Sequence, residues 1–268
     1  MLRQRTTRLT LHTALPYWMI ILALTLILPH AQSQETSQDK SPAQVAWEQQ
    51  VGPKALKEPA FQFVAEDPAL PRVLLIGDSI SIGYTPAVRA LLRGKANVLR
   101  IPVNGGPSSQ GIESLAEWLG NGKWDVIHAN WGLHDIKRMR DGQRDITAAW
   151  QVSADQYEKN LDRLMQQLKA TGATVFWAAT TPVPEGAGGR IKGDEVLANA
   201  IAARVMTRHA IPINDLYAWV LPHLAKYQRP QNVHFTPEGS AFLAQRVAER
   251  IAQALQTRAA PASTKPPS

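Results

Sequence analysis

The chain has 268 residues, of which 44% are hydrophobic and eight are tryptophan, so it is long enough for one α/β domain with a sizeable core. It contains no cysteine, which excludes disulfide bonds, thiol nucleophiles and thiolate metal sites. The formal net charge is +7, but the basic residues are scattered along the chain rather than clustered, so nucleic-acid binding gains no support.

The N-terminus carries three arginines among its first eight residues, then an apolar stretch at residues 14–28 and the small residues Ala31 and Ser33. A basic lead, a short apolar run and small residues after it are typical of a secretory signal. We therefore expect residues 1–33 to be a signal peptide and the protein to be exported, either periplasmic or secreted. The alternative is an uncleaved membrane anchor, although about 15 apolar residues span a bilayer only marginally.

Composition divides the rest of the chain into three parts. Residues 34–70 begin with a polar, turn-rich stretch at 34–45, which predicts a flexible lead followed by a short helix. Residues 71–256 are expected to form the folded domain. Residues 257–268 are rich in Pro, Ala and Ser and predict a disordered tail.

Within the domain, short apolar runs alternate with amphipathic stretches. The apolar runs predict strands at 73–76, 97–101, 126–129, 174–178 and 211–213. The amphipathic stretches predict helices at 86–92, 112–119, 155–170, 194–209, 217–225 and 237–256. This alternation is typical of the α/β class, with a parallel sheet covered by helices on both faces.

Polar or glycine-containing segments follow three of the predicted strands. They are Gly77-Asp78-Ser79, Asn104-Gly105-Gly106 and Asn130-Trp131-Gly132. In parallel sheets of this kind, ligands bind at the carboxyl ends of the strands. We therefore expect the three segments to meet at one rim of the sheet.

Ser79 and His234 are the candidate pair for nucleophilic catalysis. A serine hydroxyl becomes a good nucleophile when a base removes its proton, and His234 stands just before the last predicted helix. Gly-Asp-Ser is also good turn chemistry, so the tripeptide alone is a weak signal. We expect Asp78 to cap the turn rather than to take part in the reaction.

Other residues near these strand ends suggest oxyanion stabilisation or metal binding. The adjacent glycines Gly105 and Gly106 expose backbone N–H groups, and Asn130 and His134 have side chains that donate hydrogen bonds. A metal site at His128, His134 and Asp135 is the less favoured interpretation, and we expect neither a metal nor a cofactor.

Together, the Gly-Asp-Ser block, the glycine loop, a Gly-x-x-Asp block and a histidine before the final helix resemble the SGNH hydrolases, also called the GDSL esterase/lipase superfamily. The resemblance covers residues 72–252. It implies a flavodoxin-like three-layer α/β/α sandwich with a central parallel five-stranded sheet, with Ser79 as nucleophile and His234 as general base. It also implies oxyanion donors from the Ser79 N–H, from Gly105 or Gly106, and from a side chain of the third block.

The sequence departs from the family pattern at two positions. His134 stands where the family usually has the donor asparagine, which leaves His134 and Asn130 as candidates for that role. Gln231 stands where the family usually has the aspartate that orients the histidine, with Asn232 next to it. Gln231 or Asn232 could orient His234 through a carbonyl oxygen, although neither supplies the charge of a carboxylate. The alternatives are a serine–histidine dyad, an acid from a distant part of the chain, or weak activity.

These observations favour an exported serine esterase whose partner is a small-molecule or carbohydrate ester. Acylated carbohydrate is the favoured substrate class, with deacetylation the favoured reaction. The alternatives are a lipid or lysophospholipid esterase and a non-catalytic glycan-binding protein. Trp131 and the loop residue Arg190 are expected to line the substrate cleft, where Arg190 would meet an anionic substrate.

Overall fold

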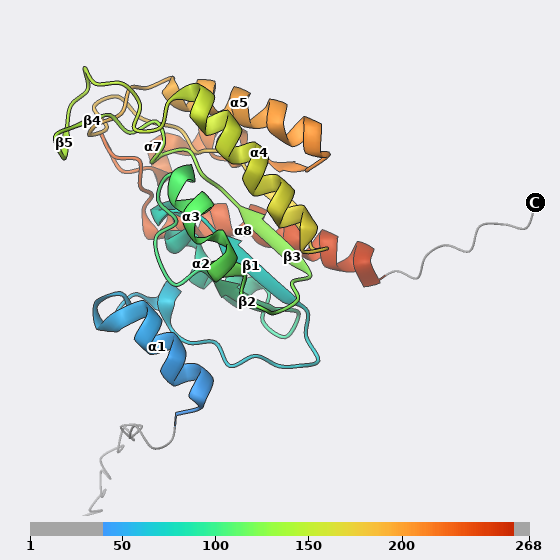
Figure 1. Ribbon diagram of the computed structural model, residues 1–268. Helices are drawn as coiled ribbons and strands as arrows, with labels where there is room; N and C mark the ends of the chain where they lie inside the picture. Colours follow the sequence, from blue (N-terminus) through green and yellow to red (C-terminus); the bar gives the residue numbers. More distant parts are fainter. Residues whose placement is uncertain (1–39, 260–268) are drawn as a thin grey trace, which may run out of the picture. The chain divides into compact units, whose positions relative to one another are not determined.

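Five parallel strands form the central sheet of the computed structural model, which describes residues 40–259. The strands are β1 (Arg72–Ile76), β2 (Asn97–Arg100), β3 (Val126–Ala129), β6 (Thr174–Ala178) and β7 (Ile213–Asn214). Their order in the sheet is β2-β1-β3-β6-β7, and Figure 1 labels β2, β1 and β3. The expected signal at 1–33 and the tail beyond residue 259 lie outside the described residues.

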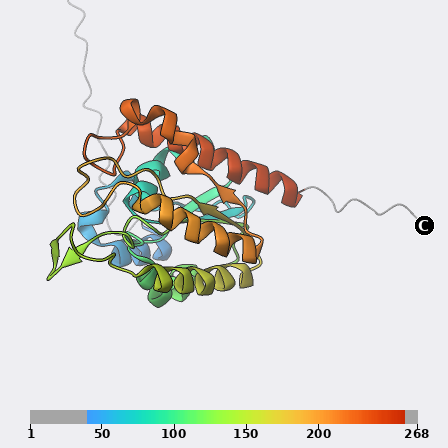
Figure 2. The ribbon, with the colours of Figure 1, turned by 90° about the horizontal axis from the view of Figure 1, so that it is seen from above.

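Helices cover both faces of this sheet, which confirms the predicted three-layer α/β fold. On one face α2 (Ser79–Leu91) packs against α8 (Pro237–Ala259). On the other, α4 (Ala154–Ala170) packs between α3 (Ser108–Leu119) and α5 (Asp194–His209). Figure 2 shows α8 and α4 on opposite sides of the strands.

The strand order places a topological switch point beside β1. The chain runs from β1 outward to β2 and then crosses back to β3 on the other side of β1. The carboxyl ends of β1 and β3 therefore diverge into loops that leave a crevice between them, which is where sheets of this kind bind ligands.

Four predicted helices differ from the observed ones by more than one residue, and one of them, α3, begins at Ser108 rather than at residue 112. Helix α2 begins at Ser79 rather than at Pro86, because Asp78 caps it and Pro86 is accommodated inside the helix. The stretch predicted as a helix at 217–225 is divided into α6 (Leu216–Val220), η2 (Leu221–His223) and α7 (Leu224–Tyr227). Pro222 lies in this break, and proline cannot donate the backbone hydrogen bond that a continuous helix needs. Helix α8 continues to Ala259, three residues into the expected tail.

The segment before β1 contains α1 (Pro42–Ala55) and the short η1 (Pro59–Phe61). Residues 42–45, predicted to be flexible, are helical because Ser41 Oγ accepts a hydrogen bond from the N–H of Gln44 at 3.2 Å. Trp47 Nε1 donates to the carbonyl of Phe61 at 2.7 Å, which holds α1 against η1.

A small antiparallel hairpin, β4 (Met139–Arg140) and β5 (Gln143–Arg144), was not predicted. Its turn residues Asp141 and Gly142 have φ values of 49° and 77°, the left-handed pair that a two-residue Asp-Gly hairpin turn requires. The sequence signal was the Asp-Gly pair, but the flanking strands are too short and polar to show alternation.

The core is continuous from the sheet to the helices on both faces. Residues 73–76 and 126–129 are buried throughout, as expected for central strands of a sheet covered on both sides. Trp131 and Trp177 stack with ring centroids 6.4 Å apart. Between residues 40 and 259, no helix has the length and apolar character needed to cross a membrane.

Candidate active site

Ser79 is the first residue of α2, directly after the turn that follows β1. Asp78 caps the helix, since its Oδ1 accepts a hydrogen bond from the N–H of Ile80 at 2.9 Å. Gly77 has no room for a side chain, because a Cβ there would lie 3.0 Å from Cβ of Ser81. The turn therefore presents the Ser79 hydroxyl at the end of the strand, with its backbone N–H in the first turn, where the helix offers it no acceptor.

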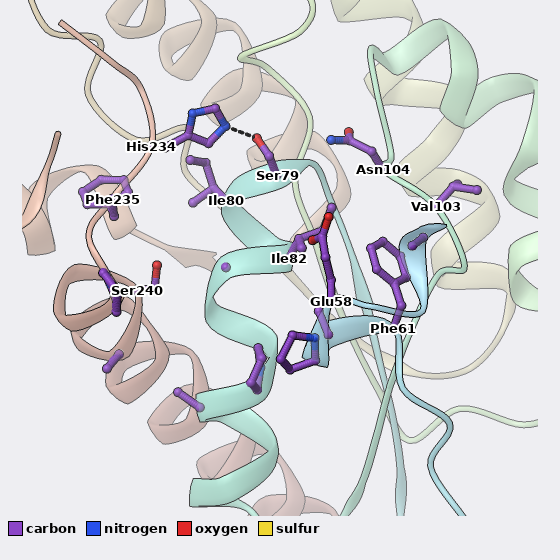
Figure 3. A pocket seen from close by; sticks show the side chains of 18 of the residues that line it. Glu58, Phe61, Ser79, Ile80, Ile82, Val103, Asn104, His234, Phe235 and Ser240 are labelled. Carbon is purple, nitrogen blue, oxygen red and sulfur yellow. Dashed lines mark hydrogen bonds between the residues drawn. The ribbon is translucent and has the colours of Figure 1, made fainter. Parts of the chain in front are cut away.

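His234 lies next to Ser79, although the two are 155 positions apart in the chain. Its Nε2 is 2.8 Å from Ser79 Oγ, and the contact is drawn as the dashed line in Figure 3. The loop before α8 carries the ring, and the backbone N–H of His234 donates to Asn232 Oδ1 at 3.0 Å. The serine hydroxyl and the imidazole are thus within proton-transfer distance.

Asn232, rather than Gln231, orients the imidazole. Asn232 Oδ1 lies 2.7 Å from His234 Nδ1, so Nδ1 carries the proton and Nε2 is free to accept one. Gln231 is exposed, has a φ of 53° and makes no hydrogen bond to His234 within residues 40–259. The residue in the family's usual acid position therefore does not touch the histidine.

The electrostatic surroundings keep His234 neutral. Burial lowers the pKa of His234 below its ordinary value of 6.5, and the charge of Asp78 opposes this effect. Arg190, Arg229 and Arg144 lower the pKa further by charge repulsion. A neutral imidazole is the form that can accept a proton from Ser79.

The two glycine N–H groups expected as oxyanion donors are already bonded. Gly105 N–H donates to the carbonyl of Gly77 at 3.0 Å, and Gly106 N–H donates to Asn104 Oδ1 at 3.0 Å. This second bond turns the Asn104 amide nitrogen toward Ser79 in Figure 3, and among the described residues that nitrogen has no hydrogen-bond acceptor. Asn104 is therefore a candidate oxyanion donor that sequence reasoning missed, although its position beside the glycines was a usable signal.

Asn130 and His134, the two side chains considered as oxyanion donors, differ in whether their donor groups already have hydrogen-bond partners. Asn130 is not free, because its Nδ2 donates to the carbonyl of Ala178 at 2.7 Å and to Thr180 Oγ1 at 3.4 Å. The ring of His134 is half-buried and has no hydrogen-bond partner between residues 40 and 259. Burial lowers the pKa of His134, so the ring is neutral and can donate one hydrogen bond.

The prediction that Trp131 lines the substrate cleft is wrong. Trp131 is fully buried, stacks on Trp177 and donates from Nε1 to the carbonyl of Gly105 at 3.3 Å. Its indole belongs to the hydrophobic core, and its hydrogen bond to Gly105 also holds the glycine loop in position. Arg190 is half-buried, and its Nε donates to the carbonyl of Leu133 at 2.6 Å.

The residues considered for metal binding do not come together as a ligand set. His128 is buried in β3, the central strand of the sheet, with Nε2 3.0 Å from Asn214 Nδ2. Asp135 is also buried and accepts from both the N–H and the hydroxyl of Ser108. Within the described part of the chain, no three His or acidic side chains are grouped to hold a metal ion.

Arg100, which the sequence did not single out, contacts several of the segments around the site. Its guanidinium donates to the carbonyls of Ile101 and Val103 at 2.9 and 3.2 Å, and to Ser81 Oγ at 3.3 Å. It also stacks on Phe61, with Cζ 4.3 Å from the ring centroid. Burial lowers the pKa of Arg100 to about 9. One side chain thus joins η1, the loop after β2 and the helix that carries Ser79.

Ser79 and His234 open into a groove of about 940 Å³. Most of its lining is apolar and comes from η1, α2, the loop after β2 and the start of α8; Figure 3 labels Phe61, Ile80, Ile82, Val103 and Phe235 among these residues. Such a surface can bind the apolar part of a substrate beside the serine.

No protein-family model and no curated protein matches the chain. Solved structures do match it. An acetylxylan esterase from Geobacillus stearothermophilus is 18% identical, with a TM-score of 0.55 over 68% of this chain and 94% of that one. A lipase/acylhydrolase from Enterococcus faecalis is 18% identical, with a TM-score of 0.56 over 68% and 96% of the two chains.

A proposed SGNH hydrolase from Slackia heliotrinireducens is similar in the same way. It is 19% identical, with a TM-score of 0.51 over 68% of this chain and 99% of that one. The match covers 94%, 96% and 99% of the lengths of these three chains. The described domain therefore has the fold of the SGNH hydrolases, in agreement with the resemblance of its motifs.

Proposed function

We propose that the protein is a carboxylic ester hydrolase in which Ser79 is the nucleophile and His234 the general base. The observation that carries this proposal is the line of contacts from Ser79 Oγ to His234 Nε2 at 2.8 Å and from His234 Nδ1 to Asn232 Oδ1 at 2.7 Å. A nucleophile bonded to a base, which is in turn held by a third group, is the arrangement that activates a serine hydroxyl.

The reaction proceeds in two acyl-transfer steps. Ser79 Oγ attacks the ester carbonyl while its proton moves to His234 Nε2, and the imidazolium then gives that proton to the departing alcohol. A water molecule next attacks the acyl-serine and gives a proton to Nε2. The serine recovers its proton as the carboxylic acid leaves, so the enzyme ends as it began.

The negative charge on the carbonyl oxygen needs hydrogen-bond donors beside Ser79. We assign this role to the N–H of Ser79, which is in the first turn of α2 and has no acceptor within that helix, and to the amide nitrogen of Asn104, which points toward Ser79 in Figure 3. The neutral ring of His134 is the third candidate. Removing one such donor typically lowers kcat by about 100-fold or more.

Among residues 40–259, no carboxylate is hydrogen-bonded to Nδ1 of His234. Asp78 is the acid whose charge raises the pKa of His234, but its Oδ1 is bonded to the N–H of Ile80. It therefore stabilises an imidazolium through its field rather than by contact. This weaker support implies a lower turnover than a serine–histidine–aspartate triad would give.

For the natural substrate we propose acetylated carbohydrate, met outside the cytoplasm after export by the N-terminal segment. Two of the structural neighbours are acetyl xylan esterases, and the basic and apolar N-terminus is typical of an exported protein. The apolar groove beside Ser79 favours a second candidate class, esters of longer or aromatic acids.

Labelling with a fluorophosphonate tests the proposed nucleophile. We expect the wild type to be labelled and the Ser79→Ala variant to be unlabelled and inactive on acetylated xylo-oligosaccharides and on 4-nitrophenyl acetate and octanoate. The acyl-length preference then decides between the two substrate classes. An unlabelled but folded wild type that retains glycans on an affinity column would instead support a non-catalytic binding protein.

A further inference from the structure

Four cationic side chains lie near the Ser79–His234 pair: Lys137, Arg144, Arg190 and Arg229, which we call the cationic rim. The N–H of Arg229 donates to the carbonyl of His234 at 3.0 Å, and both residues line the groove. The four side chains come from separate parts of the chain. Lys137 lies between β3 and β4, Arg144 is in β5, Arg190 is in the loop before α5, and Arg229 is in the loop after α7. Their charges act on the site, because Arg144, Arg190 and Arg229 lower the pKa of His234, and Lys137 and Arg190 lower the pKa of His134. The tertiary structure thus concentrates positive charge that the sequence spreads over 93 positions from Lys137 to Arg229.

The cationic rim has no carboxylate partner among the residues that the structure describes. Three acids near these cations are paired with other cations. Asp145 pairs with Arg140 at 3.0 Å, Asp194 with Arg138 at 2.8 Å, and Glu185 with Lys192 at 3.6 Å; these three acids are therefore already engaged. The charge of Asp78 acts on Arg190, although Asp78 Oδ1 is hydrogen-bonded to the N–H of Ile80. Four cations outnumber this one carboxylate, so an anion that enters between them is attracted.

Backbone contacts hold two of these cations in place. Arg190 Nε donates to the carbonyl of Leu133 at 2.6 Å, which leaves its two terminal nitrogens without a partner in residues 40–259. Arg144 lies flat against Gly188 and Gly189, where a Cβ at Gly188 would come 2.6 Å from its Nη1. The backbone N–H of Arg138 donates to the carbonyl of Gly189 at 2.7 Å, so the hairpin and this loop are fixed to each other.

The cationic rim is distinct from the apolar groove. Lys137, Arg144 and Arg190 do not line the groove, and Arg229 lies where the groove meets His234. A substrate with its carbonyl at Ser79 therefore meets an apolar surface on one side and unpaired cations on another. Guanidinium groups bind carboxylates and phosphates with paired hydrogen bonds, which suits them to recognising such groups.

We propose that the alcohol portion of the substrate carries a carboxylate or phosphate group that binds the cationic rim, while the acyl portion occupies the apolar groove. This inference rests on the proposed ester hydrolysis and adds the charge of the substrate to it.

A matched pair of phenyl acetates tests the inference: 4-acetoxybenzoate, which is anionic, and its neutral methyl ester. At pH 8 and low ionic strength we expect Lys137→Gln/Arg144→Gln to lower the ratio of kcat/KM for the anion to kcat/KM for the methyl ester about tenfold. Added NaCl should lower the rate for the anion alone in the wild type. Arg204→Gln/Arg208→Gln removes the same two positive charges from ion pairs with Glu158 and should leave that ratio unchanged.

The natural source of the anion is distinguished by two further pairs of substrates. The first compares acetylated galacturonic acid with its methyl ester, and the second compares lysophosphatidic acid with a monoacylglycerol of equal chain length. A preference for the charged member that the double variant loses supports the inference and identifies a carboxylated sugar or a phospholipid as the source.

Equal rates for charged and neutral members, with no effect of the double variant and with Ser79 still labelled by a fluorophosphonate, would overturn this inference alone. If Ser79 is not labelled and no ester is cleaved, the proposed function fails and the inference fails with it. The labelling result therefore separates the two failures.

Discussion

The side-chain oxygen of Asn232 lies 2.7 Å from Nδ1 of His234. An amide oxygen accepts the imidazole N–H and selects the tautomer in which Nε2 faces Ser79. It carries no net charge, so it does not stabilise the imidazolium that forms when Ser79 loses its proton. The geometry of a catalytic triad is thus present while part of its electrostatics is absent.

Replacing Asn232 with aspartate should supply the missing charge. We expect Asn232→Asp to raise kcat for 4-nitrophenyl acetate about tenfold or more, because a carboxylate at 2.7 Å would stabilise the imidazolium. The pKa of His234 should also rise, which would move the acid limb of the pH–rate profile upward. Steady-state kinetics from pH 5 to 9 measures both effects.

Gln231→Asp is the matched control, because Gln231 occupies the family's usual acid position without touching His234. It should leave kcat within about twofold of the wild type. A large gain from Gln231→Asp, with none from Asn232→Asp, would show that the imidazole takes its orientation from residue 231 in solution.

The pH dependence follows from the lowered pKa of His234. Burial, assisted by nearby arginines, lowers this pKa below 6.5. The neutral, proton-accepting form therefore persists to lower pH, and we expect the acid limit of kcat/KM for a neutral ester to lie below pH 6.5. Arg144→Gln should shift that limit upward, since one of the repelling charges is removed. An acid limit above pH 7 in the wild type would contradict this account.

Asn104→Asp tests the amide nitrogen as an oxyanion donor. Aspartate keeps the oxygen that accepts from Gly106 N–H but replaces the donor facing Ser79 with an anionic acceptor. We expect kcat to fall about 100-fold or more, with KM little changed, because the lost interaction develops only in the transition state. His134→Gln should be measured beside it, and a larger loss there would assign the donor role to His134 instead.

Asp135 should make the stability of the fold depend on pH. Burial raises the pKa of Asp135 from 3.8 to about 7, so the folded protein favours its protonated form. This contribution to stability is present below pH 4 and is lost as the pH rises through 7. We therefore expect Asp135→Asn to raise the free energy of unfolding at pH 8 by roughly 2 kcal/mol.

Asparagine suits this position because Asp135 Oδ1 accepts from Ser108, whereas its buried Oδ2 has no partner in the described structure. Urea unfolding at pH 5 and pH 8 measures the effect, and the difference between variant and wild type should shrink at pH 5. Destabilisation of Asp135→Asn at pH 8 would show that the ionised carboxylate is the form that the fold requires.

Local patterns in the sequence were enough to predict the sheet and most helices. Hydrophobic runs such as 73–76 depend on burial on both faces, and the period of the apolar residues in α4 depends on one buried helix face. Each of these signals can be recognised from residues that are close together in the sequence. The Ser79 and His234 assignments also came from local motifs, read together with their order along the chain.

Contacts between distant segments decided the rest. The sequence does not show whether the side chain of Gln231 or that of Asn232 reaches the imidazole. In the structure the backbone at Gln231 is left-handed, and the side chain that reaches the ring is that of Asn232. Trp131 could not be recognised as a core residue, since its burial depends on Trp177, which lies 46 positions later. The cationic rim likewise exists only where four separate segments of the chain come together, because a charge can be assigned to a site only when its neighbours in space are known.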